Sequence, residues 1–559
     1  MSAGPEGATG TTTGARTLSR LLRDLAAERG DAEALVYPAF THGDEELRLT
    51  FAQLDARVDD IARGLIAIGI EAGEHVAVWG NNVPDWVPME FALARIGAVL
   101  VTVNTALQKD EVAFVLKQSK SVAVVHTTST GTNESSKTLD ELLVEADPSV
   151  AAIRNRVWMA GLPDEEPPFG VAPDGGHAAL GGIENVIDRG KSVTPEQLAE
   201  RENATQPDDV VNIQYTSGTT GFPKGVMLSH ANIVVNSATL GRQMGLNADD
   251  RVAMIVPLFH CFGCVVAVLG TYSVGATLCC IPGFEPSAAL RLIEEEHCTI
   301  VHGVPTMFTA MLAHEDMDKR KITTLRAGLA AGAPCPVPLM KEIVERLGCP
   351  GIAVTYGLTE ASPGVAGSVP DAPLETRCQT IGKPLDGVEV MIAEPGAVQA
   401  VPDGEEGELL CRGPNVMVGY HDDPESTAAA ITSDGWLRTG DLCMRDEDGN
   451  LRISGRLKDI IIRGGENIAP AAVESVLREH PDIVGAAVVG VADEFLGEKV
   501  AAGLILKKGA TLDPPAYEEL LEGRVAKFKV PEIWQTFEAF PLTGSGKVQK
   551  YKLREMFDA

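Results

Sequence analysis

The stretch from Glu74 to Val103 constrains the fold more than any other part of this sequence. Glu74 to Trp79 is a short apolar run typical of a buried strand, and Ala98 to Val103 is a second such run. Asn82 to Arg95, between them, has the length and composition of a helix. A strand, a helix and a strand in this order form a βαβ unit, whose two strands are parallel. The sequence therefore predicts an α/β fold.

Helix and strand signals on either side of this unit extend the prediction. Thr50 and Gln53 form a capping-box signature, and apolar residues at steps of three and four follow from Phe51 to Ile68, which predicts an amphipathic helix. Further buried strands are expected at Val210–Tyr215, Val252–Val256, Thr299–Val304 and Gly351–Tyr356.

The length of 559 residues corresponds to about three or four domains or subdomains. Residues 1–17 are rich in Gly, Thr and Ala and are interpreted as a disordered lead-in. We expect a large domain of two α/β subdomains over 18–457, with surface connections at 127–209 and a small β-rich subdomain at about 385–453. A small, mobile α/β domain is expected over 458–559.

Composition excludes several classes of protein and partner. The formal charge of −31 argues against a nucleic-acid partner, because DNA and RNA would be repelled overall. Ten cysteines are too few and too unevenly placed for a disulfide scaffold, which favours a reducing, cytoplasmic location, and Cys261 and Cys264 are interpreted as buried thiols without a metal. The uncharged run from Val252 to Phe284 is divided by glycines and prolines, so we expect buried core and no transmembrane segment.

The segment from Thr216 to Gly225 (TSGTTGFPKG) carries the strongest chemical signal. It follows a predicted strand and offers three glycines that let backbone amides approach a ligand, four hydroxyl groups and one lysine. These groups suit a polyphosphate, although the segment lacks the glycine–lysine–hydroxyl ending of a Walker A loop. The sequence therefore predicts a phosphate-binding loop.

The loop resembles the signature of the adenylate-forming superfamily, and more specifically of its acyl-CoA synthetase branch. Seven further superfamily signatures recur in order across most of the chain: 257–263 (PLFHCFG), 331–334 (AGAP), 356–360 (YGLTE), 436–441 (WLRTGD), 455–459 (GRLKD), 464–467 (GGEN) and 544–547 (GSGK). The resemblance implies that a carboxylate attacks the α-phosphate of ATP to give an acyl-adenylate and pyrophosphate. Both reactants are anions, so the protein must supply positive charge.

The resemblance also implies a role for individual residues. Lys547 would bridge the substrate carboxylate and the α-phosphate, Glu360 would bind Mg²⁺, and Thr359 would contact the α-phosphate. Tyr356 would stack on adenine, and Gly357 is a further ATP-binding position. Asp441 would accept from the ribose hydroxyls, and Arg456 would reinforce the ribose-phosphate side. The remaining ATP-binding positions implied are Thr216, Ser217, Gly218, Thr219, Thr220, Gly221 and Lys224 for the phosphates, and Gly332, Ala333 and Pro334 for the base.

Three other positions are assigned by the same resemblance to the second half-reaction. His260 matches a residue between the acyl and thiol channels. Lys458 matches the hinge between the large and small domains, about which the small domain turns after adenylation. The face formed by Gly464, Gly465 and Glu466 would then line the tunnel for CoA.

The resemblance implies an ATP-dependent acyl-CoA ligase that acts on a carboxylic acid. ATP and CoA would be cosubstrates, and Mg²⁺ would be the cofactor. In amino-acid-activating relatives an aspartate in a Phe-Asp context near the pocket holds the substrate ammonium, whereas this sequence has Phe259, His260 and Cys261 there. This difference favours an uncharged acyl tail and thus a medium- to long-chain fatty acid. Two alternatives stay open: transfer of the acyl group to a free carrier protein, and luciferase-like oxygenation of the adenylate. The sequence does not distinguish a monomer from a homodimer.

Overall fold

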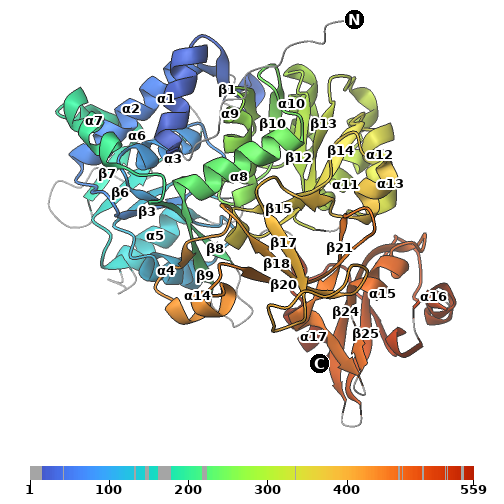
Figure 1. The fold of residues 1–559 in the computed structure, drawn as a ribbon. Coiled ribbons are helices and arrows are strands. Elements are labelled where there is room, and N and C mark those ends of the chain that lie inside the picture. The colour runs from blue at the N-terminus through green and yellow to red at the C-terminus, as the bar shows by residue number, and fades with distance from the viewer. Residues whose placement is uncertain are drawn as a thin grey trace, which may run out of the picture.

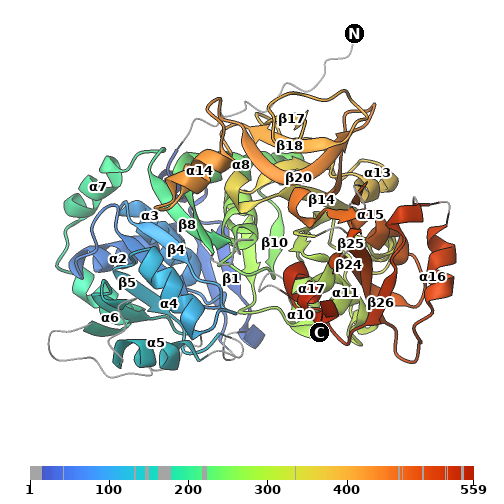
Figure 2. The same cartoon turned by 90° about the horizontal axis from the view of Figure 1, so that it is seen from below.

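The computed structural model describes residues 16–41, 43, 45–130, 134–144, 150–161, 178–216, 223–333, 335–463, 466–468, 470–493, 496–522, 524–525, 527–542 and 547–558. Two large α/β units lie side by side, a β-rich unit sits across one edge of them, and the C-terminal α/β unit lies at the periphery (Figures 1 and 2). This arrangement confirms the predicted fold class.

The first α/β unit is built on a sheet of eight described strands. Their order is β19 (Gly419–Tyr420), β9 (Lys224–Ser229), β8 (Val210–Thr216), β4 (Val99–Thr102), β3 (His75–Trp79), β5 (Ala123–His126), β6 (Asn155–Trp158) and β7 (Ala178–Gly182). The pairs from β8 to β7 are parallel, whereas β9 is antiparallel to both of its neighbours. The helices of this unit are α2 (Phe51–Ala67), α3 (Trp86–Arg95), α4 (Lys109–Gln118), α5 (Ser135–Val144), α6 (Ile183–Gly190) and α7 (Pro195–Ala204).

The second α/β unit is built on a sheet of nine described strands. Their order is β16 (Lys383–Pro384), β15 (Gly364–Gly367), β14 (Gly351–Gly357), β13 (Ala327–Ala331), β12 (Ile300–Gly303), β10 (Arg251–Met254), β11 (Thr277–Cys280), β1 (Glu33–Tyr37) and β2 (Leu47–Thr50). The pairs from β14 to β1 are parallel, and the strands at the two edges are antiparallel. Its helices are α9 (Gly270–Tyr272), α10 (Pro286–Glu295), α11 (Pro305–Ala313), α12 (Val337–Glu345) and α13 (Leu374–Gln379), whereas α1 (Leu18–Arg29) packs against α2 and α3 of the first unit.

The β-rich unit and the C-terminal unit have separate sheets. The first is an antiparallel sheet in the order β17 (Glu389–Ala393), β18 (Gly407–Arg412), β20 (Leu437–Arg445) and β21 (Leu451–Arg456), with α14 (Pro424–Ala430) nearby. The second contains β23 (Glu466–Ile468), β22 (Ile461–Arg463), β25 (Gly497–Leu506), β24 (Ile483–Asp493) and β26 (Ile533–Thr536), with α15 (Pro470–Leu477), α16 (Pro514–Leu521) and α17 (Lys550–Asp558). The single turn η6 (Leu457–Asp459), which contains Lys458, connects the two sheets.

The βαβ prediction is confirmed, with a shorter helix than expected. β3 and β4 pair in parallel, with His75 opposite Val99, and α3 connects them. The helix begins at Trp86 instead of Asn82, because Asn82 lies in the loop before the helix and its side chain makes the hydrogen bonds that hold this loop. The Asn82 amide donates to the Val256 carbonyl at 2.9 Å and accepts from the Leu258 backbone N–H at 2.9 Å, which ties this loop to the second α/β unit.

The prediction that 127–209 forms surface connections is wrong for much of that segment. It contains α5, α6 and α7 as well as β6 and β7, which extend the first sheet. Polar residues concealed the β6 strand: Asn155 and Arg156 are buried, and their side chains donate to the Ile68 carbonyl and to His126. A strand with these internal partners does not show the apolar pattern on which the prediction relied.

The largest apolar core lies between the two α/β units. Helix α8 (His230–Gln243) and the π-helical segment η3 (Phe262–Leu269) contribute buried side chains to it, together with strands of both sheets. All eight residues of η3 are buried, which agrees with interpreting Val252 to Phe284 as core. No helix in the described part of the chain is long and apolar enough to cross a membrane.

Three buried histidines make the folded state sensitive to acid. Burial lowers the pKa of His126 to about 3 and those of His230 and His302 to about 4. The unfolded chain, in which histidine titrates near 6.5, therefore takes up protons first as the pH falls. We expect each histidine to cost about 2 kcal/mol of stability by pH 5. The urea midpoint should fall between pH 7 and pH 5, and His230→Asn should flatten this dependence; an unchanged midpoint in the parent protein would contradict the expectation.

Candidate active site

Several predicted site residues lie at the carboxyl ends of neighbouring parallel strands. β13 is followed by Gly332, whose φ of +83° suits glycine, and by the exposed Ala333. β14 ends at Gly357, where a Cβ atom would come within 2.1 Å of the Pro363 carbonyl oxygen, so no larger residue fits. The turn η5 (Thr359–Ala361) follows at once and carries both Thr359 and Glu360. Two segments predicted to hold a nucleotide therefore meet at one sheet edge.

The predicted ribose group is brought together by the β-rich unit. The Tyr356 hydroxyl at the end of β14 donates to the Asp441 carboxylate of β20, and Arg456 Nε of β21 forms an ion pair with that carboxylate at 2.7 Å. Burial favours the neutral form of Arg456, but Asp441 and Tyr356 outweigh this effect and raise its pKa. The Asp441 side chain is therefore held in place as an acceptor beside a permanent cation.

The ends of the predicted phosphate loop are fixed opposite one another. Thr216 at the end of β8 pairs with Lys224 at the start of β9 in an antiparallel ladder. Ser217, Gly218, Thr219, Thr220 and Gly221 lie outside the described residues, as do Pro334, Gly464 and Gly465, while Glu466 and Lys458 are described for their backbone alone.

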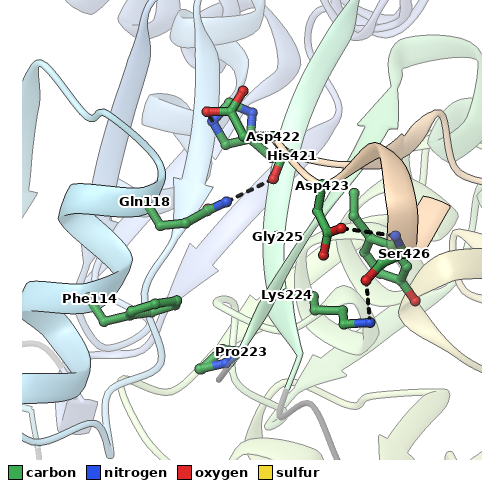
Figure 3. A pocket seen from close by; sticks show the side chains of 10 residues that line it. Phe114, Gln118, Pro223, Lys224, Gly225, His421, Asp422, Asp423 and Ser426 are labelled. Atoms are coloured by element: carbon green, nitrogen blue, oxygen red, sulfur yellow. Dashed lines mark hydrogen bonds and ion pairs between the residues drawn. The ribbon is translucent and has the colours of Figure 1, made fainter. Parts of the chain in front are cut away.

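Lys224 connects the loop to Glu360 through residues that the sequence analysis did not single out. Lys224 Nζ donates to Ser426 Oγ at 2.8 Å and lies 5.0 Å from the centre of the Tyr420 ring. The Tyr420 hydroxyl in turn donates to Glu360 Oε1 at 2.9 Å. Figure 3 shows the hydrogen-bonded pair of Lys224 and Ser426 close to Asp423, which caps α14; all three residues line a cleft of about 320 Å³. Tyr420 and Ser426 fall within 385–453, for which the sequence predicts only a β-rich subdomain.

Lys547 reaches this site from the C-terminal unit. The side chain retains access to solvent, yet the protein atoms around it and the positive charge of Arg456 lower its pKa, against the attraction of Asp441 and Glu360. These partners come from the large unit, so the small unit is turned with its lysine toward the predicted nucleotide site. An ammonium group that interacts electrostatically with these carboxylates and keeps access to solvent is suited to receive an anion.

His260 and Cys261 lie on the same side of the site as Thr359. Burial, followed by the charge of Lys547, lowers the pKa of His260 to about 4, so the imidazole is neutral at pH 7. Its Nδ1 accepts a hydrogen bond from the Phe262 backbone N–H at 3.1 Å. Cys261 Sγ lies 3.8 Å from Thr359 Oγ1, and burial raises the pKa of this thiol to about 11. The thiol is therefore no nucleophile at neutral pH.

Comparisons with known proteins agree with this fold. The ATP-bound MatB of Rhodopseudomonas palustris superposes with a TM-score of 0.80 at 28% identity, over 96% of this chain and 99% of that one. The same protein in its apo form, at equal identity and coverage, gives 0.72. The units of this chain are thus arranged more like those of the ATP-bound structure. Fold and site together define an ATP-binding enzyme with a large N-terminal domain and a small C-terminal one.

The chain belongs to the AMP-binding enzyme family. The model of this family matches residues 22–421, and that of its C-terminal domain matches residues 472–547. A Bacillus subtilis protein named as an acyl-CoA synthetase is 44% identical over 96% of each chain. The mitochondrial medium-chain acyl-CoA ligase of Danio rerio is 37% identical over 96% of this chain and 88% of its own length.

Proposed function

We propose that this protein is an ATP-dependent acyl-CoA ligase. A carboxylic acid and ATP give acyl-AMP and pyrophosphate, and acyl-AMP and CoA then give acyl-CoA and AMP. One observation carries the proposal: the ammonium group of Lys547, from the small domain, interacts electrostatically with Glu360, Asp441 and Arg456 of the large domain. A carboxylate and a triphosphate, both anions, need such a cation where they meet. The family membership and the names of the relatives support the same reaction.

The residues divide the first half-reaction among them. Asp441 accepts from the ribose hydroxyls, and Tyr356 covers the adenine together with the segment after β13. Lys224 and the loop after Thr216 hold the outer phosphates, while Thr359 contacts the α-phosphate. Lys547 neutralises the two anions as they approach and stabilises the charge that develops on the α-phosphate.

Mg²⁺ is part of the proposal, and the donor set is compatible with it. Mg²⁺ in nucleotide enzymes uses one or two carboxylates together with phosphate oxygens and water. Glu360 is half-buried, and its Oε1 accepts a hydrogen bond from the Tyr420 hydroxyl. This bond fixes the orientation of the carboxylate and leaves Oε2 for the ion. Among the described residues no group of three or more His, Cys, Asp or Glu side chains could form a metal cage. Glu360 would therefore hold the ion only together with ATP, and the ion would neutralise phosphate charge.

We propose a fatty acid of medium to long chain as the substrate. His260 is neutral and Phe259 and Phe262 are buried beside it, so this wall offers no charge to a polar headgroup such as an ammonium. The medium-chain ligase among the relatives supports this class. A cytoplasmic location is proposed because all ten cysteines are free thiols, as expected in a reducing compartment.

The deciding experiment is mass-spectrometric detection of acyl-AMP and acyl-CoA with Mg-ATP. A series of acids from acetate to palmitate is supplied, each with and without CoA. We expect thioester only when CoA is present, with the highest rate at medium or long chain length. Adenylate that accumulates unchanged in the presence of CoA would point to a carrier protein as acceptor, and no adenylate from any acid would overturn the proposal.

Asp441→Asn should weaken ATP binding more than acid binding. The change removes the charge that pairs with Arg456 and replaces one acceptor oxygen with a donor. Loss of one charge-assisted hydrogen bond costs about 1.5–3 kcal/mol, so the KM for ATP should rise about ten- to a hundred-fold. Asp403→Asn, at an exposed position of the same β-rich unit, is the matched control. Equal changes in the KM values for ATP and acid would contradict the ribose assignment.

A further inference from the structure

His302 differs from the other buried histidines of this protein. It lies on β12 with no exposed surface. His126 and His230, which are also buried, each accept a hydrogen bond at a ring nitrogen. Neither nitrogen of His302 makes a hydrogen bond of normal geometry, and the backbone of Val301 provides only a weak polar contact. A buried polar group without a partner is rare in folded proteins and calls for an explanation.

The position of His302 relates it to the proposed active site. On β12, side chains alternate between faces: Val301 belongs to the core on the outer face, and Ile300, like His302, points to the face shared with α8 and η3. Val304 follows His302 by two residues, and its side chain lies 3.2 Å from the position that a Cβ atom on Gly332 would take. Gly332 belongs to the predicted base-binding segment. Two residues of a strand span about 7 Å, so His302 lies about 7 Å further into the protein than Val304.

Phe262 joins His302 to the reaction centre from the other side. The Phe262 and His302 rings lie with their centres 6.1 Å apart and tilted by 33°. The Phe262 backbone donates to His260, whose pKa is affected by Lys547. Phe262 also begins the π-helical segment η3, a geometry often found at functional sites. Phe262 therefore lies between His260, beside the reaction centre, and His302, deeper in the core.

The imidazole of His302 can make two opposite kinds of hydrogen bond. Burial lowers its pKa to about 4, so it is neutral and offers one N–H donor and one nitrogen acceptor. A saturated hydrocarbon chain beside it satisfies neither nitrogen. A hydroxyl group can donate to one nitrogen or accept from the other, and an oxo group can accept from the N–H.

We propose that His302 is a specificity-determining residue at the inner part of the acyl pocket, and that it selects acids with a hydroxyl or oxo group on the chain. This inference rests on the proposed ligase function. Binding sites that hydrogen-bond a substrate hydroxyl discriminate strongly against analogues that lack it, because the polar groups of the site are then left unpaired. Unsubstituted fatty acids are accepted less well, since they leave His302 without a partner.

The test compares octanoate with 3-, 6- and 8-hydroxyoctanoate in the wild type, His302→Leu and His302→Gln. ATP–pyrophosphate exchange measures adenylation of each acid. In the wild type, kcat/KM should be at least ten-fold higher for one hydroxy acid than for octanoate. His302→Leu should abolish or reverse this ratio, His302→Gln should keep part of it, and the KM for ATP should stay unchanged. Because no internal hydrogen bond is lost, His302→Leu should have a Tm equal to or above that of the wild type.

A binding measurement separates this inference from the ligase proposal. Sulfamoyl-adenosine analogues with the same octanoyl and hydroxyoctanoyl groups are titrated calorimetrically, which needs no turnover and no CoA. Tighter binding of a hydroxyacyl analogue, lost in His302→Leu, supports the role of His302 even if no thioester forms. Equal affinity of all analogues for the wild type, or an unchanged ratio in His302→Leu, overturns it.

Discussion

Lys547→Ala is expected to slow acyl-adenylate formation by about a hundred-fold or more, while the conversion of supplied acyl-adenylate to thioester continues. Removing one charged contact to a transition state commonly costs about 3 kcal/mol. The effect should be confined to the first half-reaction, because Lys547 lies beside Asp441, Glu360 and Arg456 in the arrangement described and would leave the site when the small domain turns. ATP–pyrophosphate exchange measures the first step, and thioester formation from synthetic acyl-AMP measures the second.

The control for this variant is Lys552→Ala, five residues along the same unit. Lys552 stands near the ring of the exposed Tyr551 on α17, so its removal should leave both steps unchanged. The two variants also differ in how activity should depend on pH. Because burial and Arg456 lower the pKa of Lys547, the ammonium loses its proton at a lower pH than an ordinary lysine, and adenylation should fall earlier on the alkaline side. Wild-type rates for both half-reactions in Lys547→Ala would show that the assignment is wrong.

The sequence predicted those parts of the structure whose signal is local. The capping box at Thr50 and Gln53 forms as expected at the start of α2, because both partners lie within one turn. The α/β class of the C-terminal unit was also predicted, because the periodicity of its helices and strands is local. The ordered motifs also indicated which residues share a site, because their resemblance to a family relates segments that are far apart in the sequence. Periodicity relates only neighbouring residues.

What the sequence could not predict depends on contacts between distant segments. The hydrogen bond from Tyr420 to Glu360 joins residues 60 positions apart, and Lys224 to Ser426 spans 202. Neither pair has a characteristic spacing. His302 is a similar case, because an apolar-flanked histidine reads as core in the sequence. Only the structure shows that the ring lacks the partners that other buried histidines have.

Lys458→Pro is expected to leave adenylation largely intact and to reduce thioester formation strongly, by about a hundred-fold if the turn of the small domain is blocked. The residue lies in the single turn η6, between the last strand of the β-rich unit and the first strand of the C-terminal unit. Proline fixes φ near −65°, a value close to that of a 3₁₀ turn. The present arrangement, with Lys547 at the nucleotide site, can therefore persist, whereas a rotation about this φ is prevented.

Lys458→Ala is the matched control, because it removes the side chain but leaves the backbone free to rotate. If the lysine side chain itself were needed, both variants would lose thioester formation. If only the rotation matters, Lys458→Ala should behave like the wild type and Lys458→Pro should accumulate acyl-AMP in the presence of CoA. Single-turnover experiments that follow acyl-AMP and acyl-CoA together distinguish these results. Equal loss of both half-reactions in Lys458→Pro would contradict the hinge assignment, since a blocked hinge in this arrangement leaves Lys547 able to act.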